Sequence, residues 1–161
     1  MDIWKDSTWK TNKDICNGET RTGLRFRFQN EIDREVKRAC ADFGKWLRQE
    51  YNFPIRVVIY FKRSEYIKAL DGDLVSATFF EPFSKMDEPF IRIATGDYKR
   101  MLDEWGKDSA LAAILGSISH ELTHYFQWIN DICLTESGLE KQASYYRKKI
   151  ITAYAKTRVH P

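Results

Sequence analysis

The sequence has few cysteines and no long apolar run. Its 161 residues include three widely spaced cysteines, Cys16, Cys40 and Cys133, with no C-x-x-C pair. An odd number of scattered cysteines argues against a disulfide framework and favours reduced thiols in a reducing compartment. Residues 1–14 are polar and contain no hydrophobic signal core, and no stretch approaches the length of a membrane span. These absences predict a cytoplasmic chain that does not insert into a membrane.

The chain also carries little net charge. The 26 basic and 23 acidic residues leave a formal charge of +3, so we expect no direct binding to nucleic acid or to an anionic membrane. Hydrophobic residues make up 43% of the chain, which is typical of a folded globular protein. The length predicts one domain, residues 1–161, whose residues 1–28 lack a clear period and form either an N-terminal arm or a short strand.

Histidine is scarce as well, yet two of the three histidines fall in one motif. Residues His120 to His124 read HELTH, a complete H-E-x-x-H pattern. Side chains four apart on a helix lie one turn apart on the same face, so both imidazoles can reach a single Zn²⁺. Glu121 is then placed to act as a base on water at the metal. The alternative is a pair of ordinary surface or core histidines on a helix.

The surrounding residues predict a helix that begins after Ser109, as its N-cap, and ends near Asn130. Apolar residues recur at helical spacing and form one stripe: Leu111, Leu115, Ile118, Leu122, Tyr125, Phe126 and Ile129. The face that carries His120 and His124 has small or polar residues instead. The pattern therefore favours histidines that line a site over histidines packed in the core.

A catalytic zinc ion usually has three protein ligands, so a third residue is needed. Glu140 is the preferred candidate, because it begins the next predicted helix after a short turn that allows this helix to fold back. Ser137 and Glu140 also fit a capping box, in which the glutamate would close the helix N-terminus. Glu136 and Cys133 are further candidates for the third ligand, whereas His160 lies in the C-terminal tail and is a poor one.

Outside the motif, the hydrophobic pattern predicts a small sheet and several helices. Helices are expected over about residues 30–51, 64–70, 98–105 and 139–156, and strands over 55–61, 74–80 and 89–94. Because strands and helices are segregated along the chain, this order predicts an α+β domain. We expect an antiparallel or mixed sheet of about three to four strands packed on helices, with the motif helix followed by a C-terminal helix that carries the third ligand.

The motif and the helix after it resemble parts of a known class of enzymes. HELTH followed by a glutamate on the next helix is similar to the gluzincin branch of the zincin metallopeptidases. Glu140-Lys141-Gln142-Ala143 is similar to the E-x-x-A helix of ImmA/IrrE-type peptidases. The resemblance covers about residues 109–156. It implies a compact zincin-like fold, one Zn²⁺ held by His120, His124 and Glu140, and Glu121 as general base.

The resemblance implies hydrolysis of a peptide bond in a protein or peptide substrate. The alternative is a regulatory or scaffolding protein of zincin fold that binds zinc but has little or no peptidase activity. Zincin substrates commonly pair with an edge strand above the motif helix, which assigns this role to residues 74–80 or 90–94. Gluzincins often carry an acid where this chain has Ser144, so we expect Asp131, Ser144 or a backbone carbonyl to orient a histidine. Tyr145 and Tyr146 are expected to pack in the core.

Overall fold

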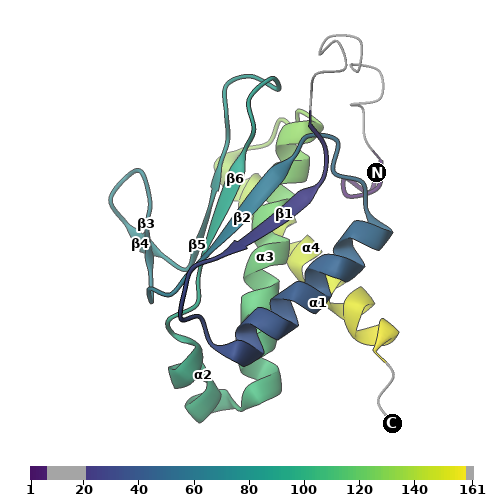
Figure 1. Cartoon of the computed structure of the whole chain (residues 1–161). Coiled ribbons are helices and arrows are strands. Elements are labelled where there is room, and N and C mark those ends of the chain that lie inside the picture. Colours follow the sequence, from purple (N-terminus) through teal and green to yellow (C-terminus); the bar gives the residue numbers. More distant parts are fainter. Residues whose placement is uncertain (7–20, 159–161) are drawn as a thin grey trace.

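The protein folds as a sheet covered by helices on one face. A computed structural model describes residues 1–6 and 21–158 (Figure 1). In chain order the elements are β1 (Leu24–Phe28), α1 (Arg34–Glu50), β2 (Val57–Lys62), β3 (Ile67–Lys68), β4 (Leu74–Val75), β5 (Ala77–Phe80), β6 (Phe90–Ala94), α2 (Tyr98–Trp105), α3 (Lys107–Ile129) and α4 (Glu136–Thr157). The predicted α+β class is confirmed. Within the described ranges, no helix has the length and apolar character needed to cross a bilayer.

Four strands form a mixed sheet in the order β1-β2-β6-β5. Strands β1, β2 and β6 are parallel, whereas β5 pairs antiparallel with β6. Strands β3 and β4 form a separate antiparallel hairpin. Of the two segments considered for substrate pairing, residues 74–80 therefore contain an edge strand, and residues 90–94 form a strand with a neighbour on each side.

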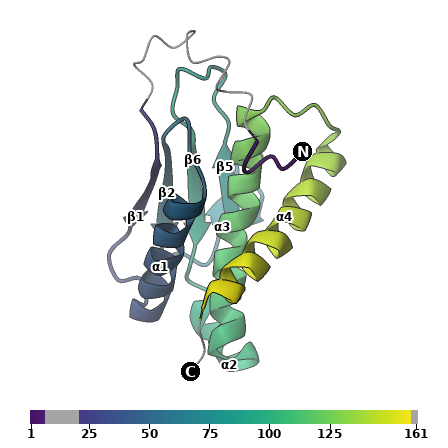
Figure 2. The same cartoon turned by 90° about the vertical axis from the view of Figure 1, so that its right-hand side faces the viewer.

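Helix α3 lies between the sheet and α4 (Figure 2). Alternate strand residues such as Ile59, Phe61, Ile91 and Ile93 are fully buried under the helices. The predicted apolar stripe of α3 is buried or partly buried as expected. Its opposite face is not free, however, because α4 covers it and buries polar residues such as Thr123 there. The two histidines consequently lie along the line where α3 meets α4.

The N-terminal residues join α3 to α4. Ile3 and Trp4 are each only 2% exposed. The Trp4 indole N–H donates to the Thr123 hydroxyl on α3 over 3.1 Å, and the Ile3 N–H donates to the Tyr146 hydroxyl on α4 over 3.3 Å. The Asn130 side chain donates to the Ile3 carbonyl over 3.0 Å. These residues form a packed arm, and residues 24–28 are a strand, so both predicted forms of the N-terminal segment occur in different parts of it.

Several predicted element boundaries are wrong in the segments where strands pair with one another. Residues 64–70 do not form a helix, because Ile67–Lys68 pairs with Leu74–Val75 as the β3–β4 hairpin. The predicted strand over 74–80 is interrupted at Ser76, so its two halves, β4 and β5, join different sheets. Both strands pair with segments close in the sequence, Ile67 with Val75 and Phe80 with Phe90, and hydrophobic periodicity alone does not show which partner a short apolar segment takes.

Helix starts also differ from the predicted caps. Helix α3 begins at Lys107 directly after Gly106, whose φ of 86° is readily adopted by glycine, so Ser109 lies inside the helix. Helix α4 begins at Glu136, and its cap is Thr135, which accepts a hydrogen bond from the Gly138 N–H over 3.0 Å. The capping role considered for Ser137 and Glu140 is therefore not adopted.

Replacement of Trp4 by alanine is expected to lower the free energy of unfolding by about 3 kcal/mol, because it removes a buried indole and leaves a cavity. The change also removes the ring contacts with Tyr51 and Phe126, whose centroids lie 5.0 and 4.8 Å away. Urea unfolding followed by circular dichroism measures the difference. Trp105→Ala, at an exposed indole of α2, is the matched control and should change stability by less than about 0.5 kcal/mol. Equal stability of the two variants would contradict a stabilising N-terminal arm.

Candidate metal centre

The connection between α3 and α4 reverses the chain and lays α4 back along α3 (Figure 2). Asp131, in the connection, has a φ of 51°, and its carboxylate accepts a hydrogen bond from Lys85 over 3.0 Å. Further along, a side chain at Gly116 would collide with Arg147, since an added Cβ would lie 2.5 Å from the guanidinium Nε. Glycine at this position therefore leaves room for the Arg147 guanidinium against α3, one turn before His120.

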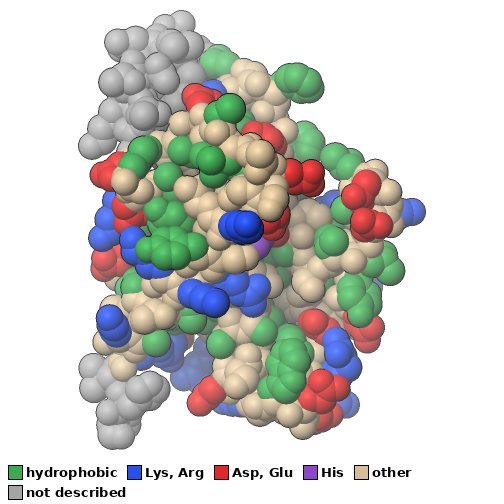
Figure 3. All heavy atoms as spheres, turned by 180° about the vertical axis from the view of Figure 1, so that it is seen from behind, with side chains coloured by type: hydrophobic (Ala, Val, Ile, Leu, Met, Phe, Trp, Pro, Cys, Tyr) green, Lys and Arg blue, Asp and Glu red, His purple; other side chains and the backbone are tan. Residues whose placement is uncertain are grey.

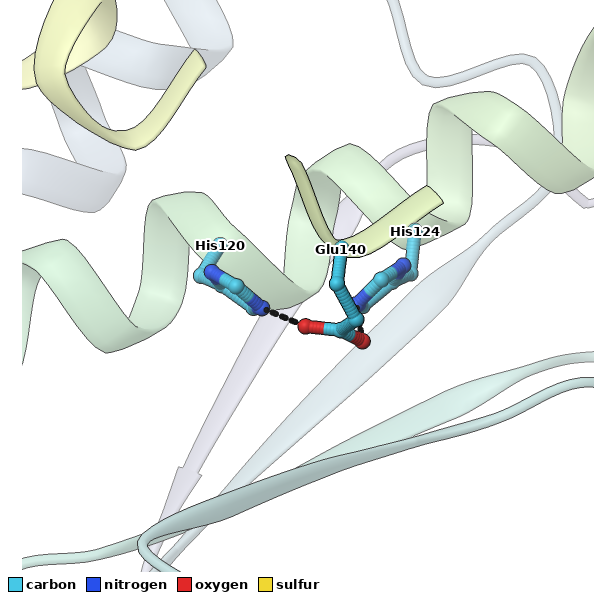
Figure 4. Close-up of side chains that lie close together, drawn as sticks. All are labelled: His120, His124 and Glu140. Atoms are coloured by element: carbon cyan, nitrogen blue, oxygen red, sulfur yellow. Dashed lines mark hydrogen bonds and ion pairs between the residues drawn. The ribbon is translucent and has the colours of Figure 1, made fainter. Parts of the chain in front are cut away.

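The reversal places the carboxylate of Glu140 between the two imidazoles (Figure 4). Glu140 Oε2 lies 2.9 Å from His120 Nε2, and Oε1 lies 3.0 Å from His124 Nε2. The imidazole centroids are 5.1 Å apart, with an interplanar angle of 77°. The side chains of His120 and His124 are 18% and 17% exposed, while that of Glu140 is 57% exposed. The structure thus brings together the three residues that the sequence predicted as metal ligands.

The three side chains fit a zinc ion in number, chemical type and spacing. Zinc takes imidazole nitrogen and carboxylate oxygen at about 2.0–2.2 Å, so its tetrahedral ligand atoms lie about 3.3 Å apart. Here one ligand atom from each residue can be chosen so that all lie within 4.8 Å of one another. A cation at this place would bind a ring lone pair of each imidazole together with a carboxylate oxygen. Among the described residues, no other His, Cys, Asp or Glu group meets this criterion.

The alternative third ligands lie outside this group. Cys133 is an exposed free thiol in the connection, and Glu136, at the start of α4, lines the nearby cleft without joining the cluster. Cys40 is buried in α1, where desolvation raises the pKa of its thiol to about 12. Cys16 and His160 fall outside the described residues. Glu140 is therefore the third member of the cluster that the structure supports.

Gln127 holds one of the histidines, a role that sequence reasoning missed. His124 Nδ1 lies 2.7 Å from Gln127 Oε1. The Gln127 amide donates in turn to the Leu139 carbonyl over 2.9 Å and to Gln142 Oε1 over 3.0 Å, both on α4. An oxygen acceptor at Nδ1 requires the proton on that nitrogen, which leaves Nε2 free as the ligand atom. The sequence indicates this contact only by spacing, because Gln127 follows His124 by three residues and shares its helix face.

The groups expected to orient a histidine are placed elsewhere. Asp131 pairs with Lys85, and Ser144 is exposed on α4. Tyr146 is buried as expected, and its hydroxyl binds the N-terminal arm. Tyr145, which was also expected in the core, is 60% exposed, so that expectation is wrong. The side chain of Tyr145 follows Ser144 on the solvent side of α4, where no neighbouring element covers it.

Glu121 lies next to the cluster in a buried position. It is 8% exposed, and desolvation, followed by the negative charge of Glu140, raises its pKa to about 8. Desolvation also lowers the pKa of His120, with the nearby His124 as the next cause. Both effects favour neutral side chains at neutral pH, and the neutral imidazole is the form that binds a metal.

A cleft of about 620 Å³ opens in front of the cluster. His120, Glu121, His124 and Glu140 line one side of it, and Ala77–Phe79 of β5 line the other. Trp128 forms part of its wall, donates its indole N–H to the Pro82 carbonyl over 3.2 Å and so holds the β5–β6 loop against α3. In the space-filling view of Figure 3, a small histidine surface is visible between charged side chains. The cluster is therefore accessible from solvent.

Comparison with protein-family models, curated proteins and solved structures finds no match for this chain. The function must therefore be argued from the geometry of the cleft and its side chains.

Gln127→Leu is expected to weaken zinc binding by about 10- to 100-fold, because His124 loses the partner that fixes its ring. Competition with a chromophoric chelator measures this affinity. Ser144→Ala, at an exposed position on the same pair of helices, is the matched control and should bind zinc as the parent does. An unchanged affinity in Gln127→Leu would show that the amide does not support the ligand.

The metal-free protein is expected to lose stability between about pH 5 and pH 8 because of Glu121. In this window the folded chain keeps a proton on Glu121 that the unfolded chain, with a pKa near 4.5, has released. The folded state then binds more protons, so this group lowers the free energy of unfolding by about 1 kcal/mol per pH unit as the pH rises. Glu121→Gln removes this titration and should become more stable than the parent toward pH 8. Urea unfolding in the presence of a chelator, at several pH values, measures the difference.

Glu104→Gln, which replaces an exposed carboxylate on α2, is the control for that experiment. It should follow the pH profile of the parent. Parallel profiles of Glu121→Gln and the parent would contradict a buried, protonated Glu121.

Proposed function

We propose that the protein is a zinc-dependent metallopeptidase that hydrolyses a peptide bond in a protein or peptide. The observation that carries the proposal is the convergence of His120, His124 and Glu140 at the side of a cleft that Glu121 also lines. Two imidazoles and one carboxylate, with a side open to solvent, are typical of a catalytic zinc site rather than a closed structural one. The H-E-x-x-H motif supplies the same set of roles from the sequence.

In this proposal the residues of the chain have separate tasks. His120, His124 and Glu140 hold the ion, and Gln127 keeps the His124 ring in the required tautomer. When bound, the zinc ion supplies Lewis acidity that acidifies water and polarises a carbonyl group. Beside a bound cation the ionised form of Glu121 is favoured, and this carboxylate would then accept a proton from the attacking water and later deliver it to the amine that leaves. Its burial beside the cleft keeps competing water away from the carboxyl group.

Strand β5 supports the choice of a peptide substrate. In the sheet β5 has a neighbour on one side only, β6, and its residues Ala77–Phe79 line the cleft opposite Glu121. An edge strand offers backbone N–H and C=O groups to an extended chain. We infer that a substrate segment adds to the free edge of β5, which would hold its backbone along the cleft.

The buried Glu121 favours a peptidase over a zinc-binding scaffold. A structural zinc site has no need of a carboxyl group that is not a ligand, and burial of such a group costs stability. The two described cysteines are free thiols, which supports the expected cytoplasmic location. A regulatory or scaffolding protein would tolerate a neutral amide at position 121 without loss of function.

Zinc analysis combined with a peptidase assay tests the proposal. The purified chain is expected to hold about one zinc ion and to cleave an unfolded protein such as reduced casein. Glu121→Gln should keep the zinc and lose activity by a factor of about 100 or more, because the general base is absent. His120→Ala and Glu140→Ala should lose both zinc and activity.

Glu136→Gln, an exposed acid at the border of the same cleft, is the matched control and should retain both properties. Full zinc in His120→Ala would refute the metal centre. Zinc binding by the parent without hydrolysis, or equal hydrolysis by Glu121→Gln, would refute the catalytic role and favour the scaffold.

A further inference from the structure

The sheet has a second face, opposite the helices, and basic side chains gather on it. Figure 2 shows the helices in front of the sheet, so this open face points away from the viewer. Side chains alternate along a strand, and Ile59, Phe61 and Ile93 point toward the helices. The outward positions of the paired strands β1, β2, β6 and β5 define the open face.

Four basic residues occupy outward positions: Arg25 and Arg27 on β1, Lys62 on β2 and Arg92 on β6. No acidic residue stands at an outward position of these four strands. In the described part of the chain, none of the four cations forms an ion pair. The near balance of total charge, from which the sequence predicted no binding to nucleic acid, therefore hides a set of strands whose outward charges are all basic.

Three aromatic rings lie between these cations. Tyr60 on β2 meets the Phe90 ring on β6 at an interplanar angle of 78°, and Phe90 stacks on Phe80 of β5 at 14°, with centroids 6.1 and 4.8 Å apart. Tyr60 and Phe80 are 38% and 39% exposed, and Lys62 Nζ lies 5.7 Å from the Tyr60 centroid. The strand register sets Arg27 beside Tyr60 and Arg25 in the row of Phe90 and Phe80. One row of the register reads Arg27, Tyr60, Arg92 and Thr78, and the next reads Arg25, Val58, Phe90 and Phe80.

A hollow of about 330 Å³ continues the open face beneath the β3–β4 hairpin. Phe80, Phe90 and Arg92 line it, together with Thr78, Phe79 and residues 69–71, of which Asp71 is acidic. The Arg92 Nε atom is buried and has no hydrogen-bond partner among the described residues. Its Nη2 atom donates to the Lys68 carbonyl over 3.2 Å, which anchors the guanidinium at the wall of the hollow. Guanidinium N–H groups donate to acceptors, and the edges of nucleic-acid bases carry such acceptors.

We infer that the open face binds single-stranded nucleic acid. Arg25, Arg27 and Lys62 neutralise phosphates, unpaired bases stack on the exposed rings, and Arg92 meets a base edge in the hollow. Three strand spacings make the face about 14 Å wide, and sheets of four strands stack two or three bases in known recognition modules. A duplex does not fit this chemistry, because its bases are already stacked on one another.

An anionic membrane would attract the same cations but suits the rings poorly. Membrane-surface proteins insert apolar side chains that project from a helix or loop, whereas Tyr60, Phe90 and Phe80 lie on neighbouring strands of a sheet. Strand β5 separates this face from the metal centre, because Ala77 and Phe79 point to the cleft side and Thr78 and Phe80 to the open face. The inference therefore does not depend on zinc or on peptidase activity.

Fluorescence anisotropy with labelled oligodeoxythymidine, oligouridine and a DNA duplex tests the inference on the full chain. Binding to at least one single strand is expected, and it should weaken as salt rises from about 50 to 200 mM. Tyr60→Ala and Phe80→Ala should each weaken binding at least about fivefold through lost stacking. Arg25→Gln with Arg27→Gln should lower the slope of log K against log salt by about 0.7 for each lost phosphate contact.

Matched control variants remove an aromatic ring or two positive charges from exposed positions on the helices. Tyr145→Ala removes an exposed ring from α4, and Lys45→Gln with Lys99→Gln removes two exposed charges from α1 and α2. These variants should bind as the parent does. No binding to either single strand at about 50 mM salt, equal binding to the duplex, or equal losses in the controls would overturn the inference. Binding to phosphatidylserine vesicles in place of oligonucleotides would overturn it in favour of a membrane surface.

Discussion

The contact between the Glu140 carboxylate and the two imidazoles depends on how closely α4 packs against α3. The ligand atoms meet at 2.9 and 3.0 Å although their residues come from two helices. Gly116 leaves room for the Arg147 guanidinium of α4 at one end. Gln127 joins the helices beside the cluster, and Trp4 packs against α3 behind it. The geometry of the site is therefore a property of the helix pair and the N-terminal arm that joins it.

Burial determines the protonation states that the cluster favours. Desolvation lowers the pKa of His120 and raises that of Glu121, so both groups tend to be neutral. A neutral imidazole offers a lone pair to a cation, and a carboxyl group with a raised pKa holds a proton near neutral pH. The cost of these buried groups is offset by the rest of the core, including fully buried Phe43 and Phe61.

The period of two along each strand divides the sheet into two surfaces with different chemistry. Inward residues such as Ile91 and Phe79 meet the helices or the cleft, whereas outward residues such as Arg92 and Tyr60 meet solvent. Strand β5 contributes to both surfaces, because it is the edge strand beside α3 and also carries Phe80. A peptide along the cleft and an oligonucleotide on the open face would therefore approach the same strand from opposite sides.

The sequence by itself determined the elements that depend on local periodicity and the residues that depend on a motif. The bounds of α2 and the histidine pair on α3 follow from spacing along one helix, and Glu140 follows from a turn too short to place α4 elsewhere. Only the tertiary structure decided the hairpin over 67–75, the role of Gln127 and the order of the strands. The strand order depends on partners remote in sequence, such as Leu24 and Val57. The hairpin depends on the choice between two short-range structures, and the role of Gln127 depends on the competition among several polar groups for one ring nitrogen. The gathering of basic side chains on the open face also depends on tertiary structure, because strand pairing places side by side residues that are far apart in the sequence.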